Sequence, residues 1–125
     1  MQRGKGKPSP RQPGDRASKR SRQEPTEAQL RDLVERATVD CYNESEQMTG
    51  FCTMIEEYLA VPFQTSVLGV EVTVEMVDLT DAEEIVVVCR REDVRQRIAI
   101  LDLPLPDPPP DGREWIEAYR YWARG

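Results

Sequence analysis

Carboxylates crowd the middle of this chain. The 53 residues from Ala37 to Cys89 contain eleven Asp and Glu but no Lys, Arg or His. Once the chain folds, these like charges must share a limited surface, and their repulsion opposes the compact state. A cation that binds only the folded arrangement would relieve the repulsion and stabilise the fold by mass action. A uniformly solvated acidic surface is the alternative interpretation of the same residues.

Two segments within this stretch offer the densest oxygen donors, and calcium takes six to eight oxygen ligands from carboxylates, amides, main-chain carbonyls and water. The first segment is Asp40, Asn43, Glu44 and Glu46, and the second is Asp78, Asp81, Glu83 and Glu84. We therefore predict Ca²⁺ as the ligand, although neither segment follows the EF-hand loop pattern. Magnesium is less favoured because it demands a tight octahedral shell and normally shares a phosphate.

Within the first segment we expect Asp40 and Glu44 to be the principal ligands, with Asn43 and Glu46 in support. Asp40 should lie at a helix end and Asn43 in the turn that follows, so that their oxygens can converge without unwinding a helix. The adjacent pair Glu56 and Glu57, by contrast, should project about 100° apart from a regular helix and chelate poorly.

Several kinds of chemistry are disfavoured by composition. The chain has no His, which excludes a Ser-His or Cys-His dyad and a histidine metal site. Its three cysteines, Cys41, Cys52 and Cys89, include no C-x-x-C pair, so we expect buried thiols in a reducing cytosol. Acid/base catalysis by paired carboxylates would need a deep cleft, and a domain of about 100 residues does not imply one. We therefore expect a protein that is not an enzyme.

The charge of the chain is divided sharply. Residues 1–24 hold eight basic and two acidic residues, a net charge of +6, whereas residues 25–125 hold nine Arg and twenty-one Asp plus Glu, a net charge of −12. We predict a disordered basic tail over 1–24 and one acidic α+β domain over 25–125. Nucleic acid is then an unlikely partner except through the tail. No membrane span or signal peptide is indicated, so a cytoplasmic location is expected.

Hydrophobic periodicity predicts helices over about 27–40, 46–59 and 112–123. Thr26 with Gln29, and Asp111 with Glu114, have the spacing of capping boxes, and Ser45 is a candidate cap for the second helix. Gly50 inside that helix predicts close packing at its position.

The period changes to two after Pro62, which predicts strands over about 70–76, 85–89 and 94–101 and a short edge strand over 64–68. Five prolines over 104–110 predict an extended strap. The fold class is therefore α+β: an N-terminal helical pair, a small antiparallel sheet of three to five strands, SH3-like and partly closed, and a C-terminal helix.

The order of these segments resembles a known family. Val39-Asp40-Cys41-Tyr42-Asn43-Glu44-Ser45-Glu46 is followed by a helix that ends in Glu56-Glu57-Tyr58-Leu59 and then by Val61-Pro62-Phe63. Together with the acidic 78–84 connection and a final helix bearing Trp115 and Trp122, this order is similar to the small bacterial calcium-binding proteins called CcbP. The resemblance covers about residues 32–123. It implies calcium binding by a compact acidic α+β protein with a role in calcium buffering or signalling.

A second interpretation needs no metal. The same acidic surface on an SH3-like sheet could recruit a basic protein partner, and the proline strap would suit an interaction module. The first interpretation has calcium ions as the partner, and the second a basic protein.

Overall fold

The computed structural model describes residues 24–125, so the predicted basic tail lies outside the described residues except for Glu24. The order of elements is helix, helix, four strands, a short 3₁₀ turn and a last helix. Their bounds are α2 Glu27–Thr38, α3 Glu44–Tyr58, β1 Phe63–Val67, β2 Val70–Leu79, β3 Ile85–Arg91, β4 Val94–Ala99, η1 Ile100–Asp102 and α4 Arg113–Ala123. The predicted α+β class, with a helical pair, a small antiparallel sheet and a C-terminal helix, is confirmed.

The sheet is an antiparallel meander in the order β1-β2-β3-β4. Short turns join its strands: Leu68 and Gly69 between the first two, and Glu92 and Asp93 between the last two. β1 and β4 are the two edges of this sheet, so within the described chain it is open.

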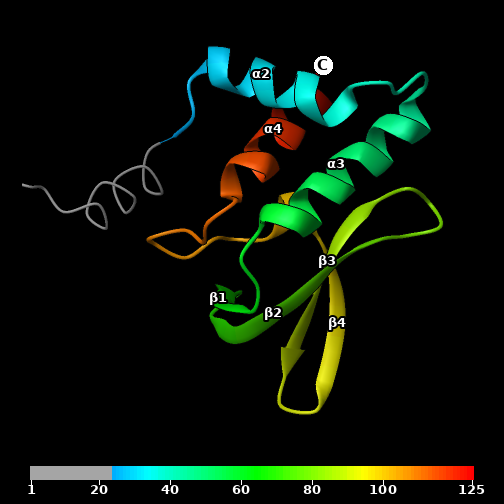
Figure 1. The fold of residues 1–125 in the computed structure, drawn as a ribbon. Helices are drawn as coiled ribbons and strands as arrows, with labels where there is room; N and C mark the ends of the chain where they lie inside the picture. The colour runs from blue at the N-terminus through cyan, green and yellow to red at the C-terminus, as the bar shows by residue number, and fades with distance from the viewer. Residues whose placement is uncertain (1–23) are drawn as a thin grey trace, which may run out of the picture.

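All three helices lie on one side of the sheet, and α4 packs against both α2 and α3 although it comes last in the sequence (Figure 1). The buried core joins Phe51 and Ile55 of α3, Val74 and Val87 of the sheet, and Trp115 of α4. The aromatic side chains of α4 contribute to this core, and the Phe51 ring lies 5.6 Å from that of Tyr119 and 5.1 Å from that of Trp122.

The first helix begins as predicted, because the Thr26 side chain accepts from the backbone of Gln29 and the Gln29 side chain accepts from the backbone of Thr26. The second helix begins earlier than predicted. Asn43, not Ser45, is its N-cap and accepts from the Glu46 backbone N–H. The helix therefore starts two residues earlier than predicted, and Ser45 lies in the first turn of α3.

The predicted capping box of Asp111 and Glu114 is wrong. The N-cap of α4 is Gly112, in a left-handed conformation with φ 91°, and not Asp111. A Cβ atom on Gly112 would lie 2.1 Å from the carbonyl oxygen of Tyr58. Only glycine allows this approach at this backbone conformation, so the chain enters α4 by close packing against the end of α3.

Gly50 packs closely, as predicted. An added Cβ there would lie 2.1 Å from the Ala37 carbonyl oxygen, so α2 and α3 meet backbone to backbone at this point. The proline-rich segment 104–110 is held at both ends: the Thr65 hydroxyl donates to the Pro104 carbonyl at 2.7 Å, and the Ala60 N–H donates to the Asp111 carbonyl at 2.9 Å.

Candidate metal centre

The two acidic segments that the sequence singled out lie next to each other. The Ser45 hydroxyl, in the first turn of α3, donates a hydrogen bond of 2.5 Å to the Glu83 carboxylate, in the connection between β2 and β3. This contact spans 38 positions of sequence. The connection between α2 and α3 and the β2–β3 connection therefore form one acidic end of the molecule, which we call the acidic pole.

The α2–α3 side of the pole is organised by its own backbone. Asp40 adopts a left-handed conformation with φ 62° and reverses the chain after α2. Asn43 caps α3, and the Glu46 carboxylate accepts the Tyr42 backbone N–H. Asp40, Asn43 and Glu44 are exposed, so the carboxylates of Asp40 and Glu44 are accessible to a cation from solvent.

The β2–β3 side is a compact turn over Thr80–Glu84. The Thr80 N–H donates to the Glu84 carbonyl, and the Thr80 hydroxyl accepts the Glu84 N–H at 3.1 Å. Glu83 is left-handed with φ 63°, and its N–H donates to the Thr80 carbonyl. This geometry leaves the side chains of Asp81, Glu83 and Glu84 exposed to solvent.

Asp78 lies elsewhere. It is part of β2, which extends to Leu79, and not of the predicted connection. One carboxylate oxygen accepts the Leu79 N–H, and the other lies 3.4 Å from Arg97 of β4. The absence of basic residues from 37–89 is thus compensated by arginines that follow this stretch in sequence.

The other predicted carboxylates have no such compensation. Within residues 24–125, none of the remaining six takes part in an ion pair. They are Asp40, Glu44, Glu46, Asp81, Glu83 and Glu84. Their mutual repulsion favours binding of a cation over an anion at this end of the molecule.

The donor types at the pole fit calcium, since they are carboxylate, amide, hydroxyl and main-chain oxygens. The positions of these oxygen donors do not form a complete coordination shell. Within the described part of the chain, no three Asp, Glu, Cys or His side chains converge closely enough to hold a metal ion. Calcium ligation by these residues therefore requires the exposed side chains of the two connections to move together.

The thiols differ in character from these oxygens. Burial raises the pKa of Cys52 to about 11, with the Glu56 and Asp78 carboxylates adding to the effect. Burial likewise raises the pKa of Cys89. These thiols remain protonated at neutral pH, which disfavours them both as nucleophiles and as soft metal ligands.

A family model described as calcium binding, that of the CcbP proteins, matches residues 32–123 of this chain. The chain belongs to this calcium-binding family, whose ligand is Ca²⁺, and the predicted resemblance is confirmed over the predicted range. The crystal structure of CcbP from Anabaena has a similar fold, with a TM-score of 0.62 at 17% identity over 79% of this chain and 92% of that one. No curated protein matches this sequence significantly. In the described residues, no helix is long and apolar enough to cross a membrane.

Proposed function

We propose that this protein binds calcium reversibly at the acidic pole, as a non-catalytic buffer or signalling protein. The observation that carries the proposal is the contact of Ser45 with Glu83, because it joins two distant segments whose six carboxylates take part in no ion pair within residues 24–125. Membership of the calcium-binding family supports the choice of ion.

The proposed ligands come from both connections. Asp40 and Glu44 are the principal ones on the α2–α3 side, with Asn43 and Glu46 in support, while Asp81, Glu83 and Glu84 serve on the β2–β3 side. Asp78 contributes less, because Arg97 and the Leu79 N–H already occupy its oxygens. Bound calcium would supply the positive charge that the pole lacks and would hold the two connections together.

Thermal unfolding with and without calcium tests the ion. Calcium at about 100 times its dissociation constant should stabilise the folded state by about 2.7 kcal/mol. For a domain of this size that corresponds to a melting point roughly 10–20 °C higher. Magnesium at the same ionic strength is the control. Absence of both a melting shift and a calorimetric signal at millimolar calcium would exclude the proposal.

Variants that remove one or two negative charges test the site. We expect Asp40→Asn alone to weaken calcium binding far more than the double change Glu56→Gln with Glu57→Gln, because Glu56 and Glu57 project separately from α3 and are exposed. Asp40 is a cleaner probe than Glu44 or Glu46, which also stabilise the first turn of α3 through the helix dipole. If the double variant weakens calcium binding as much as Asp40→Asn does, the acidic surface acts by its total charge and has no defined site.

The same pole could attract a basic partner without metal. A chelator distinguishes the two functions, since removal of calcium should leave such a complex unchanged.

A further inference from the structure

The β3–β4 hairpin carries a feature that calcium binding does not use. Among the described strands, β4 pairs only with β3, and its outer edge is open. Four consecutive residues of β4, Val94 to Arg97, are exposed, so this part of the strand meets solvent on both faces as well as along its edge. Figure 1 shows the hairpin extending away from the helices.

The turn of the hairpin determines which backbone groups face the open edge. Arg91 pairs with Val94 across the two-residue turn of Glu92 and Asp93, and Glu92 has φ 55°. In a two-residue hairpin the closing pair exchanges hydrogen bonds, and the next pair along does not. Arg95, opposite Arg90, and Arg97, opposite Val88, are therefore the residues whose N–H and C=O groups point outward.

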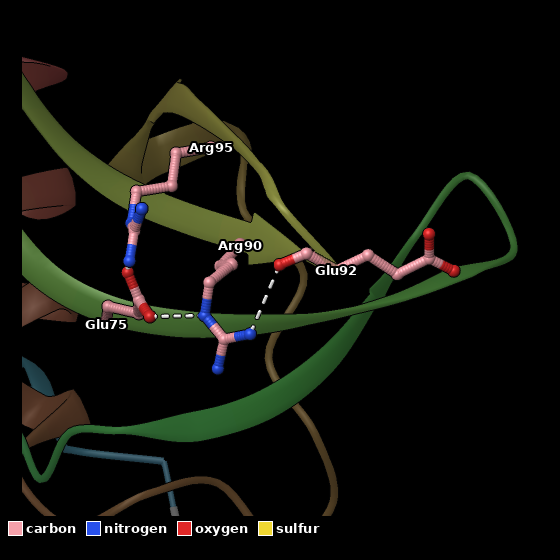
Figure 2. Close-up of polar contacts among 4 residues, drawn as sticks. All are labelled: Glu75, Arg90, Glu92 and Arg95. Atoms are coloured by element: carbon pink, nitrogen blue, oxygen red, sulfur yellow. Dashed lines mark hydrogen bonds and ion pairs between the residues drawn. The ribbon is translucent and has the colours of Figure 1, made fainter.

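The same two residues carry the charge of the strand. Arg95 and Arg97 are two apart and so project from one face of the sheet, about 7 Å from each other. Their side chains are 61% and 64% exposed. The Arg95 Nε donates to Glu75 at 2.9 Å, and Figure 2 shows Glu75 between Arg90 and Arg95. Glu75 thus orients the Arg95 guanidinium and leaves its terminal Nη groups available. Arg97 donates from one Nη to Asp78 at 3.4 Å, which leaves its other N–H groups for a partner.

A second copy of this chain is a poor partner for that edge. Antiparallel pairing of β4 with β4 would place arginine opposite arginine in each symmetric register centred on residues 95, 96 or 97. Like charges directly opposite each other destabilise a strand pair. Such charges on an edge strand discourage self-association, and they select a strand of the opposite charge.

We propose that the open edge of β4 binds an extended acidic segment of another protein by strand addition. The outward N–H and C=O groups of Arg95 and Arg97 would pair with the backbone of the added strand. Carboxylates two residues apart on that strand would match the spacing of the two guanidinium groups. A long polyanion such as nucleic acid fits less well, because it has no peptide groups to pair with the backbone of the edge strand.

The test uses the full chain in the presence of a chelator, so that calcium binding plays no part in the result. The probe is a blocked eight-residue peptide in which glutamate alternates with threonine and valine. Its control has lysine in place of glutamate. In a nitrogen–proton correlation titration we expect amide shifts concentrated at Arg95 and Arg97, with slower hydrogen exchange at both. We expect no such response to the lysine peptide.

Substitutions separate the backbone from the charge. Arg97→Gln removes the charge, and Arg97→Pro also removes the outward N–H, a change that edge strands tolerate. We expect binding at least threefold weaker for the first variant and at least tenfold weaker for the second. Arg124→Glu, an exposed change on α4's C-terminal side, should leave binding within twofold.

Three results would overturn the proposal. One is no amide shift at millimolar glutamate peptide. Another is a loss of peptide binding in Arg124→Glu as large as that in Arg97→Gln, which would show attraction by total charge only. The third is a single-stranded oligonucleotide that shifts the β4 amides while the peptide does not.

Discussion

The Ser45 hydroxyl and the Glu83 carboxylate form a hydrogen bond that ties the start of α3 to the turn between β2 and β3. Both groups belong to the acidic pole, and the bond occupies one oxygen of a proposed ligand. Calcium ligation through that oxygen would compete with this hydrogen bond.

Ser45→Ala tests that competition. Loss of one exposed hydrogen bond to a charged group should lower the free energy of unfolding in chelator by about 0.5–1.5 kcal/mol. Because calcium ligation through that oxygen would cost the wild type this bond, the variant should bind calcium about two- to tenfold more tightly. Calorimetric titration measures the affinity. Ser66→Ala, an exposed serine on β1, is the control. Weaker calcium binding in Ser45→Ala would mean that the bond helps to build the site.

Gly50→Ala should destabilise the protein strongly. The new methyl group would meet the Ala37 carbonyl at 2.1 Å, and since that contact is with backbone, only separation of α2 from α3 can relieve it. We expect a loss of about 2–4 kcal/mol in the free energy of unfolding, measured by urea denaturation. Thr53→Ala, exposed on the same helix, should change it by less than about 0.5 kcal/mol. An unchanged free energy of unfolding in Gly50→Ala would show that the helices meet less closely.

Glu75 should give the β3–β4 hairpin an acid-sensitive contribution to stability. Hydrogen bonds from Arg90 and then from Arg95 hold the pKa of its carboxyl below the ordinary value of 4.5. A lowered pKa in the folded state stabilises the protein above 4.5, and this contribution is lost as the pH falls through the folded value. The difference in unfolding free energy between wild type and Glu75→Gln should be largest near pH 7 and approach zero in stronger acid.

Urea denaturation across this pH range measures that difference, with Glu57→Gln, exposed on α3, as the control. A Glu75→Gln effect that is independent of pH would show that packing, not charge, holds the hairpin.

The three cysteines should react with a thiol reagent at very different rates. With a pKa of about 11, only about one Cys52 in a thousand is thiolate at pH 8, and the side chain is buried. Cys89 is also buried, whereas Cys41 is only partly so. We expect one fast thiol at pH 8 and two that react only on unfolding. Cys41→Ser should remove the fast phase, and a fast phase that persists in this variant would contradict the assignment.

Most elements were predictable because their patterns are local. The alternation of Val72, Val74 and Glu75, the helical stripe of α4 and the capping box at Thr26 each depend on residues a few positions apart. The two acidic segments could also be recognised from the sequence alone.

What the sequence did not predict depends on contacts between distant segments. The cap of α4 is a glycine because the Tyr58 carbonyl approaches it, and Tyr58 lies far back in the chain. Asp78 pairs with Arg97 because β2 and β4 lie on either side of β3 and the register places both side chains on the same face of the sheet. The contact of Ser45 with Glu83 has no local signature either, and the ligand assignment at the pole stays a prediction for the same reason.

The packing of α4 against both α2 and α3 has a consequence for proteolysis. Trp115, Ile116 and Ala118 of α4 are buried in the core. Detachment of this helix would expose the apolar sides of α2 and α3, so α4 cannot open independently of the core. Cleavage within the proline-rich segment 104–110 should therefore leave α4 bound to the rest of the protein under native conditions.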